Sequence, residues 1–170
     1  MSQSSIILSK FFFLSALLIL LGSFRLAPLT SEKNKGSHFH ATVPFSARLQ
    51  TSIQILGAGP IAPVRSSGSG IATHLGKTSF FANSTVNFTT QPAQINGTAT
   101  FTAANGDQFY TSFTGTTMVN GSGEAIGNFE HVITGGTGRF ENISGTLTAY
   151  SVHVMTAPTG SLRFEGSIDY

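Results

Sequence analysis

The chain has 170 residues, which is enough for one domain with a buried core, plus a short extension. Only 9% of the residues are charged, 15 are Phe and none is Cys. This composition excludes an intrinsically disordered chain, and it excludes disulfides, thiol catalysis and thiolate metal sites. Beyond residue 27, seven basic residues balance seven acidic ones without forming a basic cluster, so we expect no nucleic-acid partner.

The first predicted element is an apolar segment near the N-terminus. Residues 11–21 read FFFLSALLILL and follow Lys10. A short apolar core behind a positive charge is typical of a signal peptide, whereas a transmembrane helix needs about 20 apolar residues. We therefore expect a signal peptide over residues 1–23, a flexible linker over 24–37, and a secreted or cell-envelope domain, periplasmic or extracellular, over 38–170. The alternative is an uncleaved signal anchor, which would then be the chain's contact with a membrane.

From residue 39 onward, apolar and polar residues alternate, which is the pattern of β-strands with one buried face. Pro44 lies inside the first strand, and because it has no N–H to donate, we expect an edge or a bulge there. Residues 57–69, rich in Gly and Pro, are expected to form a loop. Asn105-Gly106 predicts a type I′ hairpin turn, in which both central residues have positive φ. The predicted strands cover residues 39–49, 70–75, 78–89, 98–103, 109–113, 124–134, 145–155 and 161–170.

Eight short strands joined by turns, with no amphipathic helical pattern, predict an all-β protein. An antiparallel meander of this length either closes into a barrel or splits into a two-sheet sandwich. We favour the barrel over the sandwich, because closure removes exposed strand edges that so few charges could protect.

The most distinctive stretch is residues 133–140, ITGGTGRF. A phosphate-binding loop is rejected, because neither a Gly-Lys-Ser/Thr sequence nor a helical pattern follows. The glycines instead indicate a tight backbone connection. Phe140 is expected to act as an apolar plug at one end of the barrel.

Four stretches carry a resemblance to a known family: residues 72–76 (ATHLG), 101–107 (FTAANGD), 135–140 (GGTGRF) and the closing strand 160–170. Over roughly residues 43–170 the chain resembles the allene oxide cyclase barrel-like group. It is most similar to uncharacterised bacterial secreted members, and more distantly to plant allene oxide cyclases and dirigent proteins. The resemblance implies an eight-stranded antiparallel, calycin-like barrel with a partly open interior, and it allows a homo-oligomer. No motif matches the family's catalytic residues, so no catalytic residue and no cofactor is inferred.

Inward-facing phenylalanines define the candidate binding site. If Phe129 and Ile133 point inward, period two turns His131 inward as well, whereas the alternative register turns Glu130 inward. The candidate ligand-binding residues are Phe45, Phe101, Phe113, Phe129, His131 and Phe164. Small residues on the same faces leave room between the rings: Ala47, Ala99, Ala103 and Gly166.

The five histidines do not predict a metal site. His38 and His40 share one strand face, but the other three are dispersed along the chain, and zinc sites need three or four converging ligands.

The predicted function is a secreted barrel module that binds a small hydrophobic molecule in the barrel. One alternative is an allene oxide cyclase-like or dirigent-like isomerase or cyclase that positions a reactive intermediate there, which would need few marked catalytic residues. Another is a surface or matrix component with no ligand. An open apolar interior favours the first two, and a filled interior favours the last.

Overall fold

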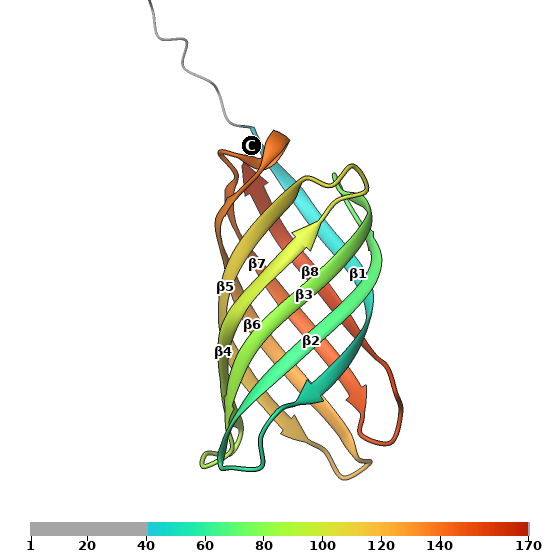
Figure 1. Cartoon of the computed structure of the whole chain (residues 1–170), viewed down its shortest axis with the longest axis vertical. Helices are drawn as coiled ribbons and strands as arrows, with labels where there is room; N and C mark the ends of the chain where they lie inside the picture. The colour runs from blue at the N-terminus through green and yellow to red at the C-terminus, as the bar shows by residue number, and fades with distance from the viewer. Residues whose placement is uncertain (1–40, 170) are drawn as a thin grey trace, which may run out of the picture. The chain divides into compact units, whose positions relative to one another are not determined.

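A computed structural model describes residues 41–169 of the chain (Figure 1). The predicted signal peptide (1–23) and linker (24–37) lie outside the described residues, as do His38 and His40. Within the described range, no helix is long and apolar enough to cross a membrane. The elements are β1 (Thr42–Ile55), β2 (Ile61–Ala72), β3 (Gly76–Asn87), β4 (Ala93–Thr102), β5 (Gln108–Val119), β6 (Glu124–Gly136), the 3-10 helix η1 (Gly138–Phe140), β7 (Ser144–Val154) and β8 (Gly160–Asp169).

The strands form a closed antiparallel barrel, as predicted. Each strand pairs with the next one along the chain, and β8 pairs with β1 to complete the circle (Figure 1). Alternation sets the two faces: on β1, Phe45, Ala47 and Leu49 are buried, while Ser46 and Arg48 between them are exposed. The closed order excludes the sandwich alternative.

Most of the loop expected over residues 57–69 is in fact strand β2. Alternation continues through it, since Val64 is buried and its neighbours are exposed. Pro63 pairs with Thr85 on β3 and lies one residue beyond the last β1–β2 pair, Ile55 with Val64. Its carbonyl oxygen accepts from Leu56 N at 2.9 Å, so the missing N–H falls at the end of the β1–β2 ladder, where proline is tolerated. Of the strand expected over residues 70–75, residues 70–72 are the end of β2, and residues 73–75 form the turn to β3.

The glycines of β2 serve close strand packing. A Cβ on Gly70 would meet the backbone of Arg48 on the neighbouring strand β1. A glycine at such a close approach looks like a loop residue in the sequence, which explains the wrong prediction for this stretch.

The edge expected at Pro44 is present. Pairing of β1 with β2 begins at Ala47, so Pro44 pairs with β8 alone. The carbonyl oxygen of Pro44 lies 3.1 Å from Nε2 of His74, in the turn that follows β2.

The turn at Asn105-Gly106 differs from the predicted type I′. Gly106 has a φ of 91°, but His74 is the non-glycine residue with positive φ in the described chain, so Asn105 does not share that conformation. Gly106 N donates to Ala103 O at 3.0 Å, and Ala103 N donates to Asp107 O at 2.8 Å. The connection is therefore a three-residue hairpin loop that ends in a left-handed glycine.

One half of the barrel interior is filled by aromatic rings. Phe101 and Phe109 stack with their centroids 4.5 Å apart, and Phe164 meets Phe101 edge-on at 4.9 Å. Phe45 contacts Phe109 edge-on at 5.8 Å. These rings belong to the main buried cluster, which we call the aromatic core, and they lie on the side of the η1 end of the barrel.

Phe140 closes the η1 end, as expected. It is fully buried and packs edge-on against Phe109 at 5.8 Å. Gly136 provides the space, because a Cβ at this position would meet both the backbone and the side chain of Phe140. The end of the barrel that carries η1 is called the closed end below.

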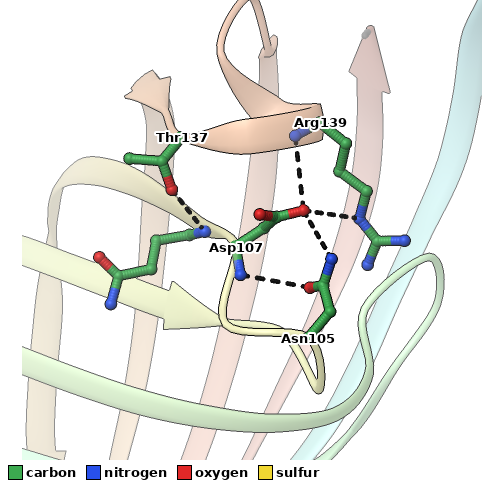
Figure 2. Close-up of polar contacts among 5 residues, drawn as sticks. Asn105, Asp107, Thr137 and Arg139 are labelled. Carbon is green, nitrogen blue, oxygen red and sulfur yellow. Dashed lines mark hydrogen bonds and ion pairs between the residues drawn. The ribbon is translucent and has the colours of Figure 1, made fainter.

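Polar contacts hold η1 over the closed end (Figure 2). The Asp107 carboxylate accepts hydrogen bonds from Asn105 Nδ2 at 2.7 Å and from the backbone N–H of Arg139 at 3.4 Å, and it lies 3.7 Å from Arg139 Nε. Thr137 Oγ1 accepts from the N–H of Gln108 at 3.0 Å. These contacts, which we call the Asp107 latch, tie the β6–β7 connection to the β4–β5 hairpin.

Candidate functional site

The other end of the barrel opens into a cavity of about 450 Å³. We call it the open end. Ligand sites in proteins commonly range from about 300 to 1,000 Å³, so this cavity has the size of a small-molecule site. The open end is formed by the loops over residues 56–60, 88–92, 120–123 and 155–159.

The cavity floor lies against the aromatic core. Phe80, Phe113 and Leu162 line it and also belong to that core. His131 lines the floor beside them, with its ring stacked on Phe113 at 4.6 Å. The floor is therefore rigid and apolar, with one imidazole built into it.

The strands place His131 there by alternation along β6. His131 is buried and pairs across the sheet with Phe113, whereas Glu130 is exposed. The register alternative with Glu130 inward is thus excluded. Burial lowers the pKa of His131 from 6.5 to about 4, because the charged imidazolium would lose its hydration. The ring is neutral at neutral pH.

His131 has one hydrogen-bond partner among the described residues. Its Nδ1 lies 2.9 Å from Oγ1 of Thr111, a fully buried residue on β5. In the described chain, the polar side-chain atoms that are shut off from solvent without a partner are His153 Nδ1 and Asp169 Oδ1. His131 Nε2 is not one of them, so this nitrogen reaches the open space of the cavity.

His153 is a second inward histidine, and it lies on the cavity wall nearer the mouth than His131 does. It lies on β7 and pairs with Ala125 near the start of β6, whereas His131 is six residues further along β6. At about 3.3 Å per residue, the two histidines are separated by about 20 Å of strand. His153 Nδ1 is buried against Gly160, where a Cβ would collide with it.

The mouth of the cavity is apolar. Several of its lining residues are also exposed to solvent: Ile55, Phe88, Met118, Val119 and Met155. The four loops of the open end contain no Asp, Glu, Lys or Arg. An apolar rim of this kind favours the entry of a hydrophobic molecule.

The cavity wall is also without charge. None of the described residues that line the cavity is an Asp, Glu, Lys or Arg. Residues 41–169 bring no group of three metal-ligating side chains together. What the wall offers chemically is apolar contact, a few hydroxyl groups, the amide of Gln91 and the two imidazoles.

The six predicted site residues divide between the cavity and the aromatic core. Phe113, Phe129 and His131 line the cavity. The other three, Phe45, Phe101 and Phe164, are packed in the core below the floor and do not border the open space. A ligand-binding role for the six stays a prediction.

The small residues expected to leave room lie elsewhere. Ala47, Ala99 and Ala103 are buried in the aromatic core, where the rings fill the space beside them. The alanines on the cavity wall are Ala82, Ala93, Ala125 and Ala157. These expected residues indicate space at the closed end, whereas the structure has its open space at the open end.

Three residues of the site were not among those predicted for it: Thr111, Val64 and His153. Thr111 sits between Phe109 and Phe113 on one strand face, and a lone hydroxyl on an aromatic face was a usable signal for a buried partner. Val64, a buried residue of the cavity wall, was missed because residues 57–69 were predicted to be a loop. His153 carried no distinguishing signal.

Comparison with known proteins supports the fold. No family model matches the chain, and no curated protein matches it. Two solved structures of pterocarpan synthase dirigent proteins are similar. PsPTS1 has a TM-score of 0.52 and 12% identity, covering 76% of this chain and 96% of its own. GePTS1 has a TM-score of 0.52 and 15% identity, covering 87% of this chain and 98% of its own.

At these identities the likeness concerns the fold alone. The predicted grouping with the allene oxide cyclase barrel-like proteins and the predicted similarity to bacterial secreted members stay predictions. The chain has an all-β, closed, eight-stranded antiparallel barrel, and this fold is similar to that of the two dirigent proteins.

Proposed function

We propose that this chain is an exported barrel protein that binds one small hydrophobic molecule in its cavity. The observation that carries the proposal is the cavity of about 450 Å³, apolar at floor and mouth and without a charged side chain on its described wall. Burying apolar ligand surface there contributes about 25 cal/mol per Å² of favourable free energy before the costs of association.

Export rests on the sequence of the N-terminal segment. Residues 11–21 have the length of a signal-peptide core and follow Lys10. Fractionation followed by N-terminal sequencing tests it. We expect a mature chain outside the cytoplasm that begins near residue 24. A cytosolic protein with Met1 intact would contradict export, and a membrane-bound chain that retains residues 1–23 would support the anchor alternative.

Native mass spectrometry tests the binding proposal without knowledge of the ligand. The protein is purified gently from its producing cells and measured before and after incubation with the neutral probe N-phenyl-1-naphthylamine. We expect one additional small molecule per chain in at least one of the two spectra. The bare chain mass in both would overturn the proposal. The same spectra report the number of subunits and so test whether the chain forms a homo-oligomer, which the resemblance allows.

The second candidate is an isomerase or cyclase of the allene oxide cyclase or dirigent type. The observation that favours it is His131, a titratable group with a strongly lowered pKa on the floor of a cavity, which is where catalytic groups are often found. The test is to incubate the protein with the molecule it retains and to follow that molecule by chromatography. Conversion to a product of the same mass supports catalysis, and unchanged recovery supports binding alone.

A further inference from the structure

The hydrogen bond between Thr111 and His131 determines which face the cavity floor presents to a ligand. Thr111 Oγ1 is fully buried and has His131 Nδ1, at 2.9 Å, as its partner in the described chain. A hydroxyl group has one proton to donate, and a neutral imidazole has one N–H. Two arrangements of the pair are therefore conceivable.

The two arrangements differ in which buried proton finds an acceptor. If His131 Nδ1–H donated to Thr111, the hydroxyl proton would be buried without an acceptor, which is unfavourable. If the Thr111 hydroxyl donates to Nδ1, both groups are satisfied. The second arrangement leaves the proton of the imidazole on Nε2, the nitrogen that reaches the cavity.

The floor therefore presents an N–H donor in an otherwise apolar setting. Phe113 stacks on one face of the imidazole, and Phe164 lies edge-on to it at 5.1 Å. Packing against these two rings restricts the imidazole, so the direction of the donor is set before a ligand arrives. A donor that has lost its water gains most from a ligand that returns an acceptor to it.

The absence of charged side chains on the described cavity wall also restricts which ligands can bind. An ionised carboxylate or ammonium group in the cavity would lose its hydration and meet no opposite charge. The neutral state of His131 means that the floor supplies no cation for an anionic ligand. Selection thus favours uncharged molecules.

We infer that the cavity selects neutral, largely apolar molecules that carry an acceptor oxygen, such as a ketone, ester or quinone carbonyl, which the Nε2–H of His131 binds at the floor. This inference rests on the proposed binding function and names the ligand class for it. Thr111 acts as a positioning residue, because it fixes the tautomer without touching the ligand.

Three matched probes test the inference on the full chain: fluorenone, which has the carbonyl, fluorene, which lacks it, and fluorene-9-carboxylate, which is charged. We expect the protein to bind fluorenone about fivefold or more tightly than fluorene, the size of one net hydrogen bond. The carboxylate should bind more weakly than fluorenone by at least the same factor. Equal affinities for fluorenone and fluorene would overturn the donor assignment, and tight binding of the carboxylate would overturn the requirement for neutrality.

Variants locate the effect. His131→Phe keeps a ring against Phe113 but has no N–H, so the preference for fluorenone should disappear while fluorene affinity stays within about twofold. The control is His74→Asn, which removes a histidine from the closed end and should leave the preference intact. A preference that persists in His131→Phe would contradict the inference.

A measurement on the unliganded native chain keeps the test decisive if His131→Phe does not fold. Nitrogen-15 NMR of the imidazole should show His131 Nε2 protonated and Nδ1 unprotonated at pH 7. The opposite tautomer would overturn the inference. Failure of all three probes to bind would reject the proposed binding function itself, whereas binding without a carbonyl preference would reject only the ligand class.

Discussion

His131 makes the stability of the barrel depend on pH. In the unfolded chain its pKa is near 6.5, and in the barrel burial lowers the pKa to about 4. The unfolded state therefore binds more protons between these two values, so stability is fully retained above about pH 6.5 and is lost as the pH falls toward 4. The cause is desolvation of the imidazolium, and no charged side chain on the described cavity wall offsets it.

We predict that His131→Gln reduces this acid sensitivity. The amide keeps a hydrogen-bonding group near Thr111 but does not titrate. Between pH 7 and pH 4 the free energy of unfolding of the native chain should fall by about 3 kcal/mol more than that of the variant. Urea unfolding at several pH values measures the difference, and parallel curves for the two proteins would contradict the buried neutral state.

Substitutions at Gly106 and Gly138 test how much a left-handed backbone conformation costs a residue other than glycine. Both have positive φ, at 91° and 58°, but a Cβ on Gly106 meets open space, whereas one on Gly138 meets the Asp107 carboxylate. Gly106→Ala should destabilise by about 1 kcal/mol through backbone strain. Gly138→Ala should cost about 2 kcal/mol or more, because it also disturbs the Asp107 latch. Equal costs in thermal or urea unfolding would show that the latch contributes nothing.

Sequence alone could identify inward residues but not their surroundings. Alternation on β6 leads correctly to a buried His131, since Ile133 on the same face is buried as well. The partner Thr111 comes from another strand, and a bulge between Tyr110 and Thr111 shifts the β5–β6 register beside it. A shift of this kind depends on how the barrel closes and leaves no mark in the periodicity.

Strand elements were predictable where their patterns were uninterrupted. β6 and β8 closely match their predicted ranges, because each alternates without proline. β2 was missed because Pro63 and its glycines resemble a loop, although neither breaks the ladder where it lies. The Pro and Gly content of residues 61–72 suggests a loop, but hydrogen-bonded pairing with β1 and β3 makes the segment a strand.

The connection from β6 to β7 works as a plug because of its aromatic residue. We predict that Phe140→Ala destabilises the barrel by about 3–5 kcal/mol, the usual cost of removing a fully buried Phe. The control is Phe81→Ala on the outer face of β3, where the side chain is 40% exposed and the cost should stay below about 1 kcal/mol. Similar losses for the two variants in urea unfolding would contradict a plug at the closed end.

The whole barrel is asymmetric along its axis. Phenylalanines from several strands meet at the closed end and fill it, while the open half stays hollow although four phenylalanines also line its cavity. The sequence indicated an eight-stranded barrel, whose interior side chains can either just fill or leave room for one ligand. Which end stays open could not be predicted, since it depends on the ring contacts formed across the barrel.

Ligand binding requires only the hollow half of the barrel. A probe that enters it should be displaced by bulk added to the cavity wall and unaffected by the same bulk added outside. Ala82 on β3 lines the cavity, and the neighbouring Asn83 points to the exposed face of the same strand. Ala125, nearer the mouth, offers a second wall position that is only half-buried, so folding depends less on it.

The most direct measurement is a fluorescence titration of the full chain with N-phenyl-1-naphthylamine. We expect saturable binding of one probe per barrel, weakened tenfold or more in Ala82→Phe and Ala125→Phe and unchanged in Asn83→Phe, with all variants folded by circular dichroism. Probe binding that does not saturate, or that Ala82→Phe and Asn83→Phe affect equally, would contradict a ligand cavity in the open half of the barrel.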